Sequence, residues 1–271
     1  MLEHMRSFVR WAGSKRLLLT QLRRYWPGGA SRYVEPFCGS ACLFFDIQPS
    51  CAILGDLNEE LIWTYRVVRN NPGLFLESFR RIRFCRKNYY KLRSTHPSQM
   101  AEADRAARFL FLNRACFNGI YRTNLKGEFN VPYGPPKSGR ILDEKWVTSA
   151  STALSRALLV RGDFETTLDH VQSGDFVYLD PPYCLKDRRM FSEYLPGSFS
   201  TSDLERLASR LRRLDERNAK FVITYADSPE ARNLLRNWRP RRVRVRRHVA
   251  GFSHHRRYAY ELIASNCSPR S

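Results

Sequence analysis

Short apolar runs typical of strands alternate with amphipathic stretches typical of helices in the first and last parts of the chain. The pattern predicts strands that begin near residues 33 and 52, and further strands over residues 157–160, 175–183, 220–225, 239–247 and 258–265. Ser200 offers an N-cap for a helix that runs through Leu214. Strands and helices that alternate in this way predict an α/β protein.

The middle of the chain has a different pattern. Apolar residues spaced near 3.6 predict helices over residues 59–70, 73–83, 86–94 and 101–115, and another over 146–154. Residues 117–134 alternate in a way that predicts a β-hairpin with its turn near Lys126 and Gly127. A mainly helical segment with a hairpin therefore interrupts the α/β pattern.

The charge of the chain indicates what kind of partner it binds. Lys and Arg total 46 against 26 Asp and Glu, so the formal net charge is +20. Such an excess favours a polyanionic partner. The basic residues are spread along the chain with aromatics between them, which indicates a folded cationic surface and not a disordered tail. A generally arginine-rich proteome is the alternative explanation.

The cysteines and the hydropathy exclude other classes. The seven cysteines are scattered, and none makes a Cys-x-x-Cys pair, which indicates reduced thiols and predicts no metal site. No apolar run approaches the roughly 20 residues of a membrane span, and the N-terminus lacks a signal-peptide core. We therefore expect a soluble cytoplasmic protein without membrane contact, and a monomer in solution.

Residues 175–183 hold the strongest candidate chemistry. An apolar, aromatic run ends at Asp180, Pro181, Pro182 and Tyr183, so a buried strand is expected to deliver these residues to its carboxyl end. Open α/β sheets bind their ligands at that edge. Beyond the prolines, a backbone carbonyl takes no part in the hydrogen bonds between strands. Together with a carboxylate and an aromatic face, it can hold a flat ring that bears an amine.

A second candidate site precedes it. Residues 33–45 predict a strand, a small-residue turn and an apolar helix, and residues 52–56 predict a strand that ends in Asp56. An acid at that place can accept hydrogen bonds from ribose hydroxyls, although it could also only cap the following helix. No Gly-x-Gly-x-x-Gly is present in the turn, which disfavours a nicotinamide or flavin enzyme. Lys15 follows a small-residue turn near a helix start, where it can meet an anionic group such as a carboxylate.

These motifs, in this order, resemble the Dam-like DNA adenine-N6 methyltransferases over almost the full length. The resemblance rests on residues 8–15 (FVRWAGSK), on residues 112–114 (LNR) leading to 127–132 (GEFNVP), and on the Asp-Pro-Pro-Tyr of residues 180–183. It implies a Rossmann-type sheet that binds S-adenosyl-L-methionine, with an inserted, mainly helical target-recognition domain carrying the hairpin. The implied division is a catalytic domain in two parts, 1–56 and 141–271, around a DNA-binding domain at 57–140. The implied setting is bacterial, archaeal or phage cytoplasm, with association to the nucleoid.

The resemblance also implies roles for individual residues. The catalytic residues would be Asp180, Pro181, Pro182 and Tyr183. The cofactor would contact Trp11, Lys15, Glu35, Pro36, Phe37, Gly39, Ser40, Asp56, Asp163, Phe164 and Asp180. Double-stranded DNA would contact Arg114, Phe117, Asn118, Arg122, Asn124, Lys126 and Lys137. Asp180 and the Pro181 carbonyl would accept the two N6 hydrogens of a flipped adenine stacked on Tyr183.

Arg122 matches the position at which relatives read a guanine, so GATC or a related site is the expected target. The chain departs from many relatives at Ala41, at Pro135 and Pro136, and at residues 223–225, to which no role is assigned. An RNA adenine methyltransferase and a catalytically inactive DNA-binding protein of the same fold are the alternatives. Cytosine-N4 transfer is disfavoured because such relatives usually have Ser in place of the first Asp of the motif.

Overall fold

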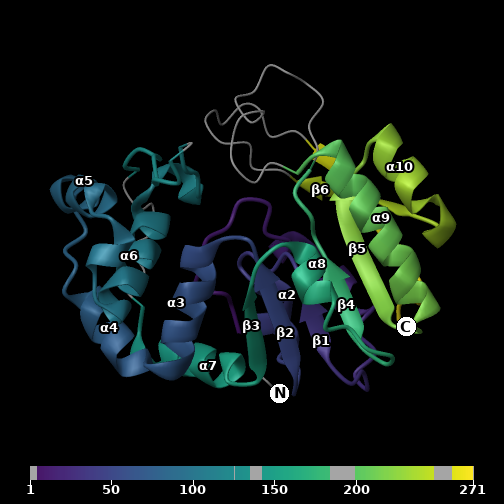
Figure 1. The fold of residues 1–271 in the computed structure, drawn as a ribbon, viewed down its shortest axis with the longest axis horizontal. Helices are drawn as coiled ribbons and strands as arrows, with labels where there is room; N and C mark the ends of the chain where they lie inside the picture. Colours follow the sequence, from purple (N-terminus) through teal and green to yellow (C-terminus); the bar gives the residue numbers. More distant parts are fainter. Residues whose placement is uncertain (1–4, 125, 135–141, 184–198, 247–257, 271) are drawn as a thin grey trace.

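The computed structural model describes residues 5–124, 126–134, 142–183, 199–246 and 258–270. Within these ranges a sheet of seven strands has helices on both faces (Figure 1). The strands are β1 (Tyr33–Glu35), β2 (Ala52–Asp56), β3 (Ala157–Arg161), β4 (Phe176–Leu179), β5 (Lys220–Ala226), β6 (Arg241–Arg246) and β7 (Tyr258–Ser265). Their order is β3-β2-β1-β4-β5-β7-β6. Strands β1 to β5 pair in parallel, and β7 is antiparallel to both β5 and β6.

The helices are α1 (Leu19–Arg23), α2 (Cys42–Ile47), α3 (Glu59–Asn70), α4 (Pro72–Arg80), α5 (Arg86–Ser94), α6 (Glu102–Ala115), α7 (Glu144–Leu154), α8 (Phe164–Leu168), α9 (Thr201–Glu216) and α10 (Pro229–Leu235). The predicted α/β architecture is confirmed, and most predicted elements begin and end within two residues of the observed ones. The short helices α8 and α10 were not predicted. No helix in the described ranges is long and apolar enough to cross a membrane.

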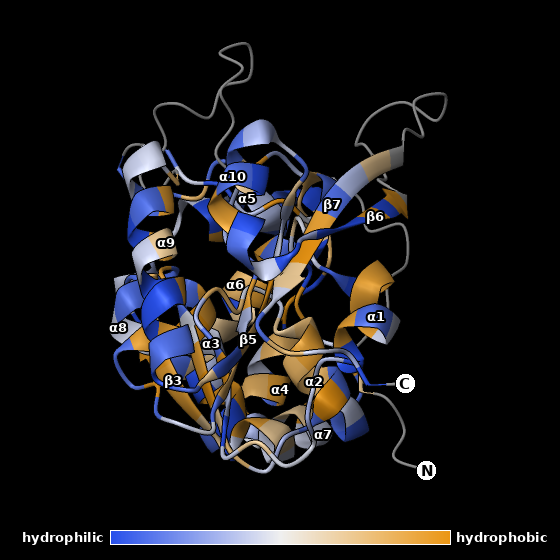
Figure 2. Ribbon diagram, turned by 90° about the vertical axis from the view of Figure 1, so that its right-hand side faces the viewer, coloured by the Kyte–Doolittle hydropathy of each residue, from blue (hydrophilic) through white to orange (hydrophobic). Residues whose placement is uncertain are grey.

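Successive side chains of each strand point to opposite faces of the sheet, so an apolar core lies on each face. Val34, Ile53 and Val177 pack with residues of α8, α9 and α10 on one face of the sheet. Their neighbours Tyr33 and Phe176 pack on the other face with α1, α2 and the inserted helices. In Figure 2 much of the ribbon of α9 is blue, whereas that of α2 is largely orange. The parallel strands are thus covered on both faces, and only their ends are free to hold polar side chains.

The inserted helices α4, α5 and α6 stand beside the sheet, next to its outer strand β3 (Figure 1). Helix α3 connects the sheet with the inserted helices, because it packs both on α6 and along β3. Arg66 Nη2 donates to the Leu159 carbonyl at 2.9 Å, and Arg69 Nη1 donates to the Ala157 carbonyl at 3.0 Å. Two guanidinium groups therefore bond the free edge of the sheet.

The predicted hairpin is present only in part. Single antiparallel bridges join Thr123 to Phe129 and Cys116 to Tyr133, and no regular strand pair forms in the described residues of this loop. The Asn124 side chain accepts hydrogen bonds from two backbone N–H groups, those of Lys126 and Glu128. Side chains that bond nearby backbone groups compete with ladder formation, which explains the difference.

Candidate functional site

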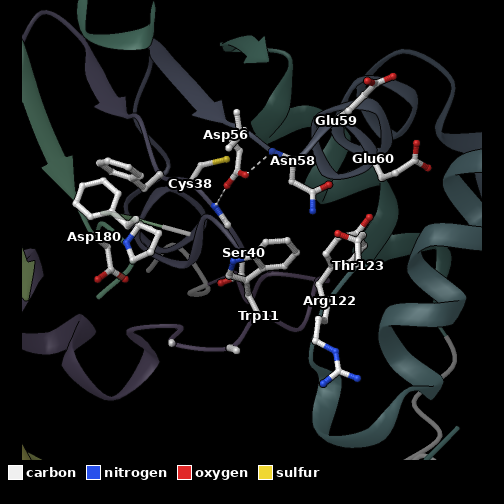
Figure 3. Close-up of a pocket in the computed structure, with 18 of the residues that line it drawn as sticks. Trp11, Cys38, Ser40, Asp56, Asn58, Glu59, Glu60, Arg122, Thr123 and Asp180 are labelled. Atoms are coloured by element: carbon white, nitrogen blue, oxygen red, sulfur yellow. Dashed lines mark hydrogen bonds between the residues drawn. The ribbon is translucent and has the colours of Figure 1, made fainter. Parts of the chain in front are cut away.

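A cleft of about 2510 Å³ opens at the carboxyl ends of the parallel strands and extends to the loop at 121–130. All the residues for which a catalytic or cofactor role was expected line this cleft. They come from the N-terminal segment, the turn after β1, the end of β2, the start of α8 and the end of β4. Figure 3 shows Asp180 on one side of the turn and Arg122 with Glu59 on the other.

Asp180 follows β4 directly and is held by a buried cation. Lys15 Nζ lies 2.7 Å from Asp180 Oδ1 and 2.8 Å from Oδ2, and it also donates to the Gly13 carbonyl at 2.9 Å. Only 5% of the Lys15 side chain is exposed. Burial opposes its charge, but the carboxylate of Asp180, helped by that of Glu261, raises the pKa of Lys15 overall. The anionic partner expected for Lys15 is therefore the carboxylate of the Asp-Pro-Pro-Tyr motif in this structure.

Two residues of β5 contact the same motif. Thr224 Oγ1 lies 2.9 Å from Asp180 Oδ1. The ring of Tyr225 meets the ring of Tyr183 edge-on, with 5.3 Å between centroids. Lys15 Nζ is 5.3 Å from the centroid of the Tyr183 ring. The carboxylate and the aromatic ring thus each contact neighbours within the protein.

The turn after β1 is bonded to the end of β2. Asp56 Oδ2 accepts from the Gly39 N–H at 2.9 Å, and Oδ1 accepts from the Asn58 N–H at 2.8 Å (Figure 3). The residue that caps α3 is Asn58, whose side chain accepts from the Leu61 N–H, so capping does not explain Asp56. Burial raises the pKa of Asp56, although the two N–H groups partly offset this.

Close packing leaves room only for glycine at the centre of the turn. A Cβ on Gly39 would lie 2.6 Å from Cδ1 of Trp11, and Gly39 has a positive φ of 45°. Ala41 also adopts a left-handed conformation, with φ 47°, at the start of α2. The substitution of Ala for the glycine of many relatives therefore leaves the turn closed, at a cost in backbone strain.

Glu35 lies at the end of β1, deep in the cleft, with 2% exposure. Tyr33 donates its hydroxyl to Glu35 Oε2 at 2.8 Å. Burial raises the pKa of Glu35 well above its ordinary value, and the charges of Asp180 and Asp56 act in the same direction. This carboxyl group therefore keeps its proton to a higher pH than an exposed glutamate does.

Asp163 and Phe164 begin α8 at another corner of the cleft. Asp163 caps the helix by accepting from the Glu165 N–H at 3.0 Å, and Arg206 Nη2 donates to the same oxygen at 2.6 Å. Phe164 stacks on Phe37 with 5.2 Å between centroids. A small helix start, an ion pair and two stacked rings define this corner.

The residues expected to contact DNA fall into separate places. Arg122, Asn124 and Lys126 line the cleft, and Phe117 and Asn118 are exposed outside it. Arg114 is buried instead, and its Nη2 donates to the Phe8 carbonyl at 2.9 Å. That position does not favour direct contact with DNA. Lys137 lies outside the described residues.

Three residues of the site were not predicted from the sequence. Glu261, an acid within the apolar strand β7, lines the cleft with 4% exposure, 4.0 Å from Lys15 Nζ. Tyr121 stacks on Trp11 with 5.8 Å between centroids. Thr224 Oγ1 lies 2.9 Å from Asp180 Oδ1. A charged residue in an otherwise apolar strand was the available signal for Glu261, whereas Tyr121 and Thr224 offered none. In the described ranges, no group of His, Cys, Asp and Glu could hold a metal ion.

Several known proteins are similar to this chain over most of its length. A type II methyltransferase, M1.LlaDCHI of Lactococcus lactis subsp. cremoris, is 35% identical and aligns over 97% of this chain and 96% of its own. M.MjaIII of Methanocaldococcus jannaschii is 36% identical over 81% of this chain and 84% of its own. The DNA adenine methylase of Escherichia coli is 31% identical over 96% of this chain and 94% of its own. The profile of one family matches residues 11–249. The chain belongs to that family, the D12 class of N6 adenine-specific DNA methyltransferases.

Proposed function

We propose that this adenine-specific DNA methyltransferase transfers a methyl group from S-adenosyl-L-methionine to N6 of an adenine flipped out of duplex DNA. The observation that carries the proposal is the meeting of three parts in one cleft. These are Asp180 at the end of β4, the Gly39 turn bonded to Asp56, and the exposed Arg122 of the loop. The family membership supports adenine N6 in DNA as the acceptor.

The cofactor would lie along the Gly39 turn. Each oxygen of Asp56 accepts one backbone N–H, so each keeps a lone pair for a ribose hydroxyl. Asp163 and Phe164, steadied by Arg206, would meet the adenine of the cofactor, and Trp11 would flank its methionine part. S-adenosyl-L-methionine supplies an electrophilic methyl group on a sulfonium sulfur.

The acceptor base would meet the Asp-Pro-Pro-Tyr motif. The lone pair of the adenine amine is delocalised into the ring, so the amine is a weak nucleophile. Asp180 and the Pro181 carbonyl would each accept one N6 hydrogen, which draws the nitrogen towards tetrahedral geometry and aims its lone pair at the methyl group. A carboxylate has about four lone-pair sites. Lys15 contacts both oxygens and Thr224 only Oδ1, so Oδ2 retains a site for the amine.

Extraction of the base costs a few kcal/mol, and stacking on Tyr183 would offset part of it. Positioning then does most of the catalysis, because an in-line displacement needs alignment more than acid or base power. Arg122, exposed on the loop, suits a bidentate contact to a guanine in the major groove, and GATC or a related site is the proposed target. Residues 57–140 form the proposed recognition domain, with α3 shared between the two domains.

The test is transfer of labelled methyl groups to unmethylated plasmid DNA, followed by base analysis and mapping with methylation-sensitive digestion. Wild-type protein should label N6 of adenine and protect GATC sites. Asp180→Ala should abolish transfer yet still bind the cofactor in calorimetry. Asp104→Ala, an exposed aspartate on α6, is the matched control and should retain activity.

Several results would overturn parts of the proposal. Normal turnover by Asp180→Ala would refute the catalytic account. Preferred transfer to RNA would refute duplex DNA as the substrate, and protection at an unrelated sequence would refute GATC. Failure of wild-type protein to bind S-adenosyl-L-methionine would indicate an inactive DNA-binding protein.

A further inference from the structure

The pairing of β4 and β5 brings an unassigned hydroxyl group to the reactive carboxylate. The register pairs Tyr178 with Val222 and Leu179 with Ile223. The next pair in that register is Asp180 and Thr224, and their side chains meet at 2.9 Å. Thr224 is fully buried, so its hydroxyl must find partners within the protein.

The Thr224 hydroxyl has one proton to donate and three candidate acceptors, one of which is the Tyr178 hydroxyl oxygen at 3.3 Å. Asp180 Oδ1 lies at 2.9 Å, and the Leu179 carbonyl lies at 3.4 Å. The shorter contact to a charged acceptor is the stronger one, so the proton points to Asp180. The Tyr178 hydroxyl, 3.3 Å away, can then donate to the free lone pairs of Thr224. A chain of donors runs from Tyr178 through Thr224 to the carboxylate.

This series of hydrogen bonds sets the orientation of the Asp180 carboxylate. Lys15 contacts both oxygens of Asp180, at 2.7 and 2.8 Å, so it does not distinguish one oxygen from the other. The β-branched Thr224 sits on a central strand, where its side chain has little rotational freedom. The fixed bond to Oδ1 therefore leaves Oδ2 as the oxygen presented to the cleft.

We propose that Thr224 is a positioning residue, whose hydroxyl fixes the Asp180 carboxylate in the orientation that accepts the adenine amine. The inference rests on the proposed role of Asp180. Thr224 itself touches neither substrate nor cofactor in this account. It acts on the rate of the chemical step, and not on binding of the cofactor or on extraction of the base.

The experiment compares Thr224→Val, which removes the hydroxyl at nearly constant shape, with Thr224→Ser, which keeps it. A hydrogen bond to a charged group is worth enough that Thr224→Val should lower the single-turnover rate by about 10- to 100-fold. Thr224→Ser should restore the rate to within about threefold. Tyr178→Phe, which removes only the outer donor, should lower the rate by a few-fold.

Three further readouts separate positioning from a structural role. In Thr224→Val, the cofactor affinity by calorimetry and the 2-aminopurine fluorescence of the flipped base should be close to wild type, and the melting temperature should fall by only the few degrees that loss of one buried hydrogen bond costs. Thr167→Val is the matched control, because Thr167 is buried and its hydroxyl has no hydrogen-bond partner among the described residues. If Val does not fit beside the carboxylate, Thr224→Ala provides the same comparison without steric conflict.

The outcomes distinguish this inference from the proposed function. Wild-type protein without transfer to DNA would refute the proposed function itself. An active wild type with equal rates in Thr224→Val, Thr224→Ser and Thr167→Val would refute only the role of Thr224. Equal losses in the Val and Ser variants, or a loss explained by cofactor affinity, would also overturn it.

Discussion

The carboxyl edge of the sheet and the loop at 117–134 handle charge in opposite ways. At the edge, Lys15 and Asp180 pair within the protein, with 5% and 18% of their side chains exposed. On the loop, Arg122 and Lys126 are exposed, and the Arg122 Nε donates to the Asn130 side chain at 2.8 Å. The first region neutralises its charges by pairing them within the protein, whereas the second exposes its cations to solvent.

This difference suits two kinds of task. Transfer chemistry gains from groups whose orientation is fixed in advance, since no reorganisation is then needed at the moment of reaction. Recognition of DNA gains from hydrated cations that can exchange water and counterions for phosphates and base edges. Substitutions in the two regions should therefore separate stability from DNA affinity.

The largest effect is expected for Lys15→Met. It leaves the carboxylates of Asp180 and Glu261 without their buried cation, and loss of one partner of a buried pair costs about 3–5 kcal/mol in the free energy of unfolding. Chemical denaturation measures this cost. Lys126→Met, on the exposed loop, is the control and should change stability by less than about 0.5 kcal/mol. Equal stability of the two variants would remove the contrast between the regions.

The pH dependence of that effect follows from the raised pKa of Lys15. A folded-state pKa above the unfolded value means that the stabilisation is complete below about pH 10 and is lost only at higher pH. The difference between wild type and Lys15→Met should thus be constant between neutral pH and pH 9.

Arg122→Ala should have the next largest effect, on activity and not on stability. Loss of a bidentate contact to guanine costs about 1–3 kcal/mol of discrimination, or roughly 10- to 100-fold in kcat/KM on the preferred sequence. Steady-state kinetics on duplexes with single base changes measure it. Lys126→Met should instead weaken binding equally on all sequences. Unchanged sequence preference in Arg122→Ala would argue against guanine reading by this residue.

Glu35→Gln tests the protonated carboxyl group in the buried region. The raised folded-state pKa of Glu35 means that wild-type protein loses stability as pH rises above about 4.5, by as much as ~1.4 kcal/mol per pH unit until the folded-state pKa is reached. Gln cannot ionise, so the variant should lack this slope. Thermal denaturation from pH 5 to 8 checks the prediction, and parallel curves for the two proteins would contradict it.

Arg206→Met should have the smallest effect. The Arg206 side chain is 38% exposed and pairs with Asp163 and Glu165, so the loss of stability should stay below about 1 kcal/mol and shrink at high salt. A modest loss of cofactor affinity is expected, because Asp163 is no longer steadied. Arg212→Met, on the exposed side of α9, is the control. A stability loss as large as that of Lys15→Met would contradict the distinction between buried and exposed pairs.

The sequence was most informative where one local rule decided the structure. Two prolines after an apolar run ended β4 at Leu179, directly before Asp180, and the alternation of side chains along the strands predicted the two cores. Small helices such as α8 escaped notice because one turn contains too few residues for a periodic signal. Its N-cap, Asp163, was the available sign.

Features that depend on pairing across the sheet could not be predicted in the same way. The partner of Thr224 is set by the register of β4 and β5, which no local pattern specifies. The family resemblance implied that Arg114 contacts DNA. It lies on α6, whose residues from Ala106 onward are all buried, so the helix has no outward face there.

The two arginines of α3 that bond β3 have a consequence for how molecules of this protein meet one another. An outer strand with free carbonyl groups can pair with a strand of a second chain, which is a common start of aggregation. Here Arg66 and Arg69 occupy the carbonyls of Leu159 and Ala157. An incoming strand must first displace two charged side chains, so the helix that packs on both α6 and β3 also opposes edge-to-edge association of the protein.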